Sequence, residues 1–172
     1  MSVNRGKQFE NVIRKSFECV EGVSIDRIND NTAGFKGIAG ICDFIVYLKP
    51  YQYYIECKTV HGNTLSIFGN DEKHKYGRIT NKQWEGLLEK SKIEGVRAGL
   101  IVWWVDKDIT LFIDIRRLKF LRDAGCKSIR YDNCEWSNLI ISIHGKKKRV
   151  FFDYDMERFF RDIDGHTFLH NW

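Results

Sequence analysis

Hydrophobic side chains near the N-terminus recur every three to four residues. Between residues 6 and 20 they form a single stripe made of Phe9, Val12, Ile13, Phe17 and Val20. Residues at this spacing share one face of an α-helix, so the pattern predicts an amphipathic helix. Glu10 lies just off the stripe, from where it can project toward a site beside the helix.

Shorter apolar runs predict β-strands in the next part of the chain. Apolar and polar residues alternate across 23–28, which predicts a strand, and the polar segment 29–40 that follows is rich in turn-forming residues. Two further runs, 41–48 and 53–58, flank residues 49–52, which contain the only proline of the chain. We expect these runs to form a β-hairpin, because a short turn joins antiparallel strands.

The rest of the chain alternates between predicted loops, helices and strands. After a polar loop that extends to residue 77, we expect a helix at 81–92 with Thr80 as its N-cap, paired strands at 98–105 and 109–115, a helix at 116–124, a hairpin of 139–144 with 150–152 around a turn at 145–149, and a helix at 155–162. The strand at 98–105 is nearly all apolar, which places it in the centre of the sheet. Together these elements predict an α/β fold with a mixed β-sheet flanked by helices.

Length and composition indicate one domain across residues 1–172. A chain of 172 residues with 43% hydrophobic residues can bury one sizeable core, and nothing in it marks a linker. The five cysteines contain no Cys-x-x-Cys pair, which argues against a disulfide framework or a zinc ribbon and favours the reducing cytoplasm. The N-terminus lacks an apolar leader and the apolar run 100–105 is too short to cross a bilayer, so we expect neither export nor a membrane partner.

Charged residues inside the two hairpin runs are the most informative feature of the sequence. Asp43 stands in the first run, and Glu56 and Lys58 stand in the second. Since side chains alternate along a strand, Glu56 and Lys58 point to one face while Cys57 points back into the core. Asp43 and Glu56 are separated by 13 positions, which fits two strands folded back through a short turn. The sequence therefore predicts that two carboxylates and one ammonium group meet.

This trio suits metal-assisted phosphodiester hydrolysis. Mg²⁺ binds oxygen ligands, usually one or two carboxylates with substrate phosphate and water, and Mn²⁺ is expected to substitute for it. We predict that Asp43, Glu56 and the backbone carbonyl of Cys57 hold a metal that polarises the phosphate and activates water. Lys58 then orients the attacking water or balances developing charge. The alternative is a structural ion pair of Glu56 with Lys58, which Asp43 disfavours because a second carboxylate beside the pair costs stability without a cation.

An aspartate in one strand and Glu-x-Lys in the next resemble the pattern of the PD-(D/E)xK nuclease superfamily. Within it, the chain is most similar to RecU-type Holliday-junction resolvases, which are often phage-encoded. The similarity lies in the first hundred residues or so and is carried by Arg5-Gly-Lys-Gln-Phe-Glu10, Gly37-Ile-Ala-Gly-Ile-Cys-Asp43, Glu56-Cys-Lys-Thr59 and Ile79-Thr-Asn-Lys-Gln83. The chain departs from the family by having Cys42 where the superfamily has proline, and by having only 29–40 where RecU-type enzymes carry a long basic stalk.

The resemblance implies a restriction-endonuclease-like fold and an endonuclease that resolves branched DNA, as a symmetric homodimer with recombination proteins as candidate partners. It also implies that Glu10, Asp43 and Glu56 are metal-site residues, that Lys58 is the catalytic lysine and that Gln83 assists. Two alternatives stay open: a nuclease of the same superfamily that acts on linear duplex in restriction or repair, and a non-catalytic DNA-binding protein of the same fold. The intact set of Asp43, Glu56 and Lys58 favours catalysis.

A formal net charge of +5 is compatible with a nucleic-acid partner. The candidate DNA-contacting residues lie near the N-terminus, in loops and in the late hairpin; they are Arg5, Lys7, Thr32, Phe35, Lys36, Lys73, Lys75, Arg78, Lys146, Lys147, Lys148 and Arg149. Phe35 is the aromatic residue expected to touch DNA at the branch point, and the basic loop with Lys73 is expected to close over it. The run 146–149 has two interpretations of equal weight, a tip that tracks phosphates or a solvated turn.

Overall fold

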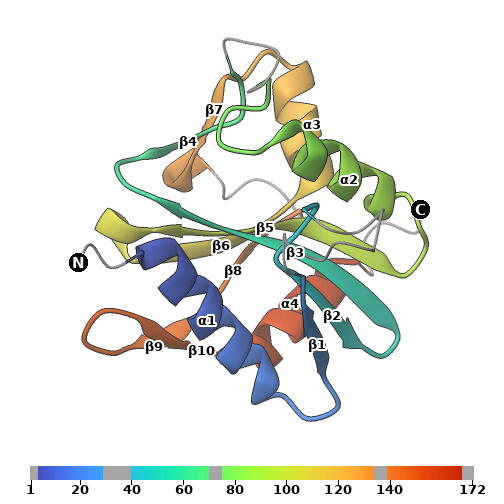
Figure 1. Ribbon diagram of the computed structural model, residues 1–172, viewed down its shortest axis with the longest axis vertical. Helices are drawn as coiled ribbons and strands as arrows, with labels where there is room; N and C mark the ends of the chain where they lie inside the picture. Colours follow the sequence, from blue (N-terminus) through green and yellow to red (C-terminus); the bar gives the residue numbers. More distant parts are fainter. Residues whose placement is uncertain (1–3, 29–39, 70–74, 134–138, 168–172) are drawn as a thin grey trace.

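The computed structural model describes residues 4–28, 40–69, 75–133 and 139–167, and within them a six-stranded mixed β-sheet forms the centre of the molecule (Figure 1). In spatial order its strands are β1 (Ser24–Arg27), β2 (Phe44–Leu48), β3 (Tyr51–Val60), β5 (Val96–Trp104), β6 (Ile109–Asp114) and β8 (Ile140–Ser142). β3 and β5 run parallel, and the other neighbouring pairs are antiparallel. The nearly all-apolar strand β5 lies between β3 and β6, as the sequence predicts.

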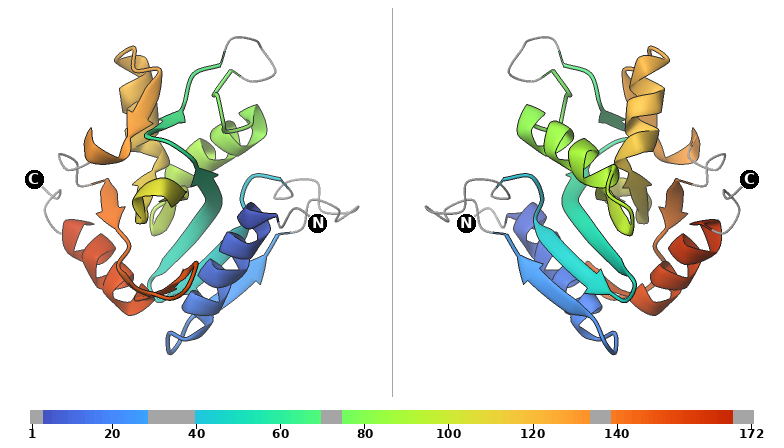
Figure 2. Two further views of the ribbon diagram at one scale, coloured as in Figure 1. Left: turned by 90° about the vertical axis from the view of Figure 1, so that its left-hand side faces the viewer. Right: turned by 90° about the vertical axis from the view of Figure 1, so that its right-hand side faces the viewer.

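Helices cover both faces of the sheet, as Figure 2 shows from two sides, so the predicted α/β fold is confirmed. α1 (Arg5–Glu18) and α4 (Met156–Thr167) pack on one face, with α1 burying its predicted stripe. The core on this face includes Phe9, Ile13, Phe17, Ile55, Trp103 and Phe159. α2 (Asn81–Ser91) and α3 (Ile115–Asp123) pack on the other face. Each helix in the described ranges is too short or too polar to cross a membrane.

The predicted hairpin of β2 and β3 is present, with a tighter turn than expected. Leu48 pairs with Tyr51 beside the turn, and Phe44 pairs with Ile55 at the far end. Continuing this register by one residue sets Asp43 opposite Glu56. The backbone supports this, because the Asp43 N–H donates to the Ile55 carbonyl at 3.0 Å.

The parallel pairing of β3 with β5 determines where α2 lies. Parallel neighbours need a crossover connection, and here the crossover contains α2. The helix therefore begins near the carboxyl end of β3 and packs back over the sheet. Gly86 permits a close approach, since a Cβ on it would lie 2.4 Å from Cγ2 of Ile41, two residues before Asp43. Both features bring the first turn of α2 beside the hairpin.

The predicted late hairpin is wrong in its pairing. β8 joins the main sheet by pairing with β6, because Ile141 is buried against the core beneath α4. The hairpin forms instead from β9 (Gly145–Lys147) and β10 (Phe152–Tyr154). Lys146 and Lys147 are thus strand residues and not turn residues, and the tip lies at 148–151.

The polar loop that follows β3 contains a strand that the sequence analysis did not predict. β4 (Thr64–Ser66) pairs with β7 (Ser128–Arg130), another strand absent from the prediction. Both strands are three residues long, too short to show a period, and they lie far apart in sequence. Their buried residues Leu65 and Ile129 extend the core under α3.

Candidate active site

Asp43 sits at the entry to β2, where the hairpin fixes its carboxylate beside β3. Its Oδ2 accepts the backbone N–H of Cys57 at 2.7 Å. In an antiparallel ladder the N–H and C=O of one residue point to the same side, so the Cys57 carbonyl also points toward the Asp43 edge. Cys42, the residue before Asp43, is buried, and burial raises the pKa of its thiol to about 12. It packs as an apolar side chain.

Glu56 is a buried carboxylate in the middle of β3, with 4% of its surface exposed. Its Oε1 accepts one hydrogen bond from Lys58 Nζ and one from Gln83 Nε2, each at 2.6 Å. Burial raises the pKa of Glu56 to about 8; the Lys58 charge opposes the shift, and the charges of Asp43 and Glu10 add to it. Among the described residues, hydrogen bonds to this carboxylate are found at Oε1 and none at Oε2, which makes Oε2 a candidate metal ligand.

Gln83 links the start of α2 to β3. Thr80 caps the helix by accepting the Gln83 N–H at 3.2 Å, and Gln83 Oε1 accepts the Thr80 N–H at 3.1 Å. The same Oε1 accepts from Lys58 Nζ at 3.3 Å. This capping box orients the Gln83 amide so that its Nε2 faces Glu56. The structure therefore brings Glu56, Lys58 and Gln83 into one network, on the sheet face that carries α2.

Glu10 approaches the cluster from α1, but it already has a partner. Its Oε2 accepts from an Arg27 guanidinium nitrogen at 2.7 Å. Burial raises the pKa of Glu10, and the negative charge of Asp43 adds to the shift while Arg27 and Lys7 oppose it. Arg27 is a residue near the candidate site that the sequence pattern did not single out. It lies in the exposed strand β1 and pairs with Phe44, next to Asp43.

The residues at this edge fit a magnesium ion bound through few protein ligands. In the described part of the chain, no group of three or more His, Cys, Asp or Glu side chains is arranged to hold a metal. Mg²⁺ commonly uses one or two carboxylates together with waters and substrate phosphate. Asp43, Glu56 and the Cys57 carbonyl meet that requirement, and the raised pKa of buried Glu56 is the condition that a cation would relieve. Glu10 is positioned to influence Asp43 electrostatically.

Comparisons with known proteins give a likeness of fold. No protein-family model matches the chain, and no curated protein matches it. Among solved structures, the chain is similar to Hjc of Archaeoglobus fulgidus, a Holliday junction resolvase from an archaeal hyperthermophile, solved at 1.6 Å. The sequence identity is 16% and the TM-score is 0.44, over 66% of this chain and 75% of the Hjc chain. A likeness this distant carries no weight for function.

The predicted DNA-contacting residues fall in three places. Arg5 and Lys7 are exposed in the first turns of α1. Arg78 is exposed beside the end of β3, where its guanidinium lies 3.5 Å from the Thr59 carbonyl, and the Lys75 ammonium lies over the Tyr76 ring at 5.3 Å. Thr32, Phe35, Lys36 and Lys73 lie outside the described residues. Lys82, which is not among the predicted residues, reaches Gly40 from the first turn of α2.

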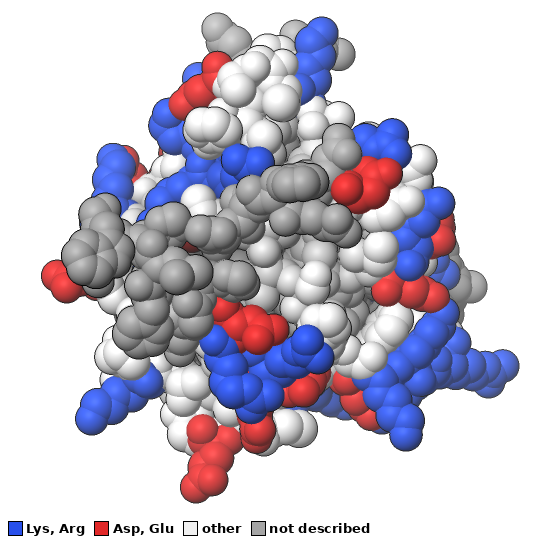
Figure 3. All heavy atoms as spheres, turned by 180° about the vertical axis from the view of Figure 1, so that it is seen from behind, with Lys and Arg blue, Asp and Glu red and all other residues white. Residues whose placement is uncertain are grey.

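The basic run of β9 is partly neutralised within the fold. Lys147 forms an ion pair with Asp108, and Lys148 pairs with Asp153 at 2.7 Å. For Lys146 and Arg149, no ion pair is found among the described residues. Seen from behind, basic side chains form separate groups divided by acidic and uncharged ones (Figure 3). The visible part of this face therefore does not present one continuous positive stripe.

Proposed function

We propose that this protein is a Mg²⁺-dependent endonuclease that hydrolyses phosphodiester bonds in branched DNA, with four-way junctions as its substrate. The observation that carries the proposal is the buried Glu56 carboxylate, which is bonded to Lys58 and Gln83 and lies beside Asp43. Burying an ionised carboxylate close to other carboxylates lowers the stability of the fold, so a purely structural role explains Glu56 poorly. A carboxylate in this position is suited to binding a cation that contacts a substrate phosphate.

The residues divide the chemistry among them. Asp43, Glu56 Oε2 and the Cys57 carbonyl would hold Mg²⁺, which when bound polarises the phosphate and makes water more acidic. An ammonium group has three donors, and Lys58 uses two of them on Glu56 and Gln83. The third donor remains for the attacking water or a phosphate oxygen, where charge develops as the P–O bond breaks.

Gln83 holds this arrangement in place. Its amide bridges Glu56 and Lys58, and its own orientation is fixed by the cap of α2. The Lys58 ammonium is thereby aimed before substrate arrives, which avoids reorganisation during the reaction. Gln83 is thus a positioning residue in this proposal.

The junction substrate rests on the sequence resemblance to RecU-type resolvases. Resolving a junction requires two cuts in opposed strands, so a twofold homodimer with one site per subunit fits the reaction. Recombination proteins and a cytoplasmic location belong to the same proposal.

The test compares substrates under identical conditions. The protein is incubated with a labelled four-way junction and with a linear duplex of the same arm sequence, in Mg²⁺ and in EDTA. Paired cuts in the junction that require Mg²⁺ support the proposal. Equal cleavage of both substrates would instead indicate a duplex nuclease. Cleavage of neither substrate would favour a non-catalytic DNA-binding protein.

A further inference from the structure

A groove of about 890 Å³ lies between α1 and the β9–β10 hairpin. β1 packs on one side of α1 and β10 on the other, so the groove and the Arg27–Glu10 pair are separated by the helix (Figure 1). The mechanism proposed above does not use this groove. One wall is a face of α1 along its whole length, from Arg5 to Cys19 just past its end, and the other is the segment 148–154, which comprises the hairpin tip and β10.

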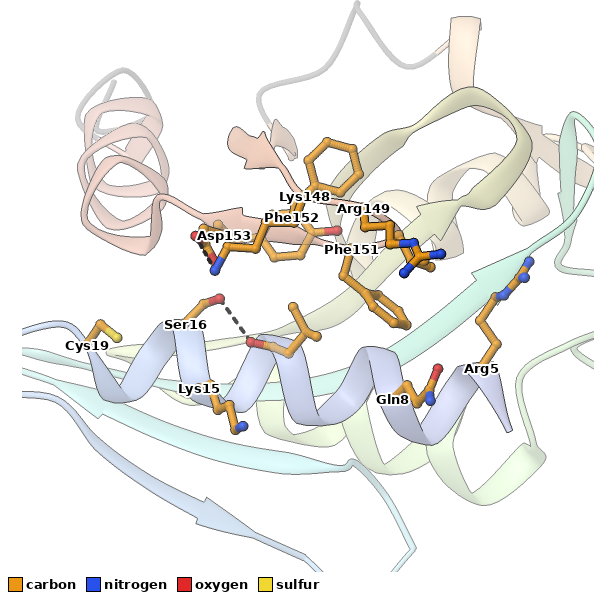
Figure 4. Close-up of a pocket in the computed structure, with 13 residues that line it drawn as sticks. Arg5, Gln8, Lys15, Ser16, Cys19, Lys148, Arg149, Phe151, Phe152 and Asp153 are labelled. Atoms are coloured by element: carbon orange, nitrogen blue, oxygen red, sulfur yellow. Dashed lines mark hydrogen bonds and ion pairs between the residues drawn. The ribbon is translucent and has the colours of Figure 1, made fainter. Parts of the chain in front are cut away.

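Aromatic and aliphatic side chains form the hairpin wall. The Phe151 ring is half-buried and packs on buried Trp103, with the ring centroids 5.4 Å apart. Phe152 stacks on Tyr154, and Val150 leaves 47% of its surface exposed. Figure 4 shows the Phe151 ring between the hairpin and α1, near Gln8. The tip therefore presents an apolar surface that a flat ring can cover.

Cations border this apolar surface. Arg5 and Lys15 come from α1, and Lys148 and Arg149 come from the tip. The acidic residue of the lining, Asp153, is neutralised by Lys148 at 2.7 Å. The groove lining is thus positively charged overall, with Arg149 beside Phe151 and Arg5 at the N-terminal end of α1 (Figure 4).

We propose that this groove binds an unpaired DNA strand that leaves the branch point. Cations that follow a phosphate backbone, together with aromatic rings on which bases stack, are how proteins bind single strands. A space of this volume is in the range of small-ligand sites, so it admits a few nucleotides but not a duplex. The identity of the ligand as DNA rests on the proposed function.

The position of the groove extends that function. Arg5 and Gln8 lie within two turns of Glu10 on the same helix. A strand held in the groove can pass over the N-terminus of α1 toward the catalytic edge. The protein is then expected to prefer branched DNA with a single-stranded arm over a fully paired junction.

Binding to a fluorescent oligo(dT) tests the proposal directly. Fluorescence anisotropy in EDTA excludes cleavage and needs no metal. The variant Arg5→Ala with Arg149→Ala removes two groove cations, and Lys119→Ala with Lys127→Ala removes the same charge from exposed positions outside the groove lining. A third variant, Phe151→Leu, keeps apolar packing on Trp103 but removes the ring.

The groove variant is expected to weaken oligo(dT) binding about tenfold and to reduce the slope of log K against log[salt] by about 1.4, at roughly 0.7 per single-strand phosphate contact. Phe151→Leu is expected to weaken oligo(dT) binding about fivefold through lost stacking. The charge-matched control should change it about twofold or less.

A matched duplex completes the test. Losses at least several-fold larger for oligo(dT) than for the duplex support a single-strand site. Equal losses on both ligands, or a groove variant that binds oligo(dT) like the control, would overturn it. This experiment measures binding without catalysis. If the protein cleaved no DNA, the proposed function would be refuted, but the binding experiment would still test the groove.

Discussion

Glu56 is held in surroundings that favour its protonated form when no cation is bound. Burial alone raises its pKa, and the carboxylates of Asp43 and Glu10 add to the shift. Lys58 opposes these effects without cancelling them, since the pKa remains at about 8. A bound cation would lower the pKa of Glu56 and stabilise its ionised form at neutral pH. If Glu56 is a metal ligand, its ionisation couples metal binding to folding stability.

This coupling gives a pH-dependent prediction for Glu56→Gln. An acid whose pKa rises from 4.5 to about 8 on folding binds more protons in the folded state, so stability falls as pH rises between those values. Glutamine mimics the protonated form and avoids the loss. In EDTA, the variant and the parent should unfold alike in urea near pH 4.5, and the variant should be more stable above pH 8, by on the order of 5 kcal/mol.

Magnesium supplies the control for that experiment. Mg²⁺ should raise the free energy of unfolding of the parent at pH 8 and leave Glu56→Gln nearly unchanged, because the variant lacks a charged ligand. Parallel pH curves for the two proteins in EDTA would contradict the account of Glu56.

The candidate-site residues that can be predicted from the sequence are those whose charge conflicts with their apolar neighbours. Asp43, Glu56 and Lys58 stand in apolar runs, where burying a charge needs a reason. Arg27 gave no such signal, because β1 is mostly exposed and an arginine there is ordinary. Its pairing with Glu10 depends on how α1 packs beside β1, which a local pattern does not specify.

At the scale of elements, the approach of α2 to the hairpin is the feature that assembles the site. Gly86→Ala should favour the helix intrinsically by up to about 1 kcal/mol. The new Cβ would, however, lie 2.4 Å from Ile41 Cγ2 and 2.8 Å from its Cβ, and overpacking of this kind costs about 1 to 3 kcal/mol. We expect net destabilisation in urea unfolding and a lower cleavage rate, since the helix that carries Gln83 must shift.

Gly6→Ala is the matched control in α1. A Cβ at Gly6 meets its nearest atom, Asn4 Oδ1, at 3.4 Å, so this substitution should be neutral or stabilising. If both alanine variants were stabilised equally, close packing of α2 on Ile41 would have no role in the fold.

The cap of α2 is a second test at this scale. Thr80→Val removes the side-chain acceptor of the Gln83 N–H and should cost about 1 kcal/mol of stability. Thr80→Val should also lower kcat by a larger factor than it raises KM, because Gln83 loses its orientation toward Glu56 and Lys58. Thr80→Ser keeps the cap and should keep the activity. If steady-state kinetics showed that Thr80→Ser lowers kcat as much as Thr80→Val does, the positioning role of Gln83 would be contradicted.

Elements with a long period or a clear turn were predictable, and short ones were not. The stripe of α1, the hairpin of β2 and β3 and the cap of α2 each follow from local sequence. β4 and β7 contain three residues each, and their pairing joins distant segments. The basic run at 146–149 suggested a turn, but β8 completes the main sheet and leaves β9 free to pair with β10.

For the whole molecule, the expected assembly is a twofold homodimer. Two sites in fixed opposition allow both strands of a junction to be cut within one encounter. Sedimentation velocity at micromolar concentration should give about twice the chain mass of 20.3 kDa. A monomer at this concentration that also releases singly nicked junctions would contradict the dimer.

Cleavage of a four-way junction by the parent, Asp43→Asn and Lys58→Ala, each in Mg²⁺ and in EDTA, is the most direct measurement of the central claim. Asp43→Asn should abolish Mg²⁺-dependent cutting while junction binding persists, because it removes a metal ligand and leaves the basic residues in place. Lys58→Ala should slow the single-turnover rate by orders of magnitude, since it removes a contact that strengthens in the transition state. Cleavage by Asp43→Asn at the parent rate would contradict the account, because the hairpin carboxylates would then not be the metal site.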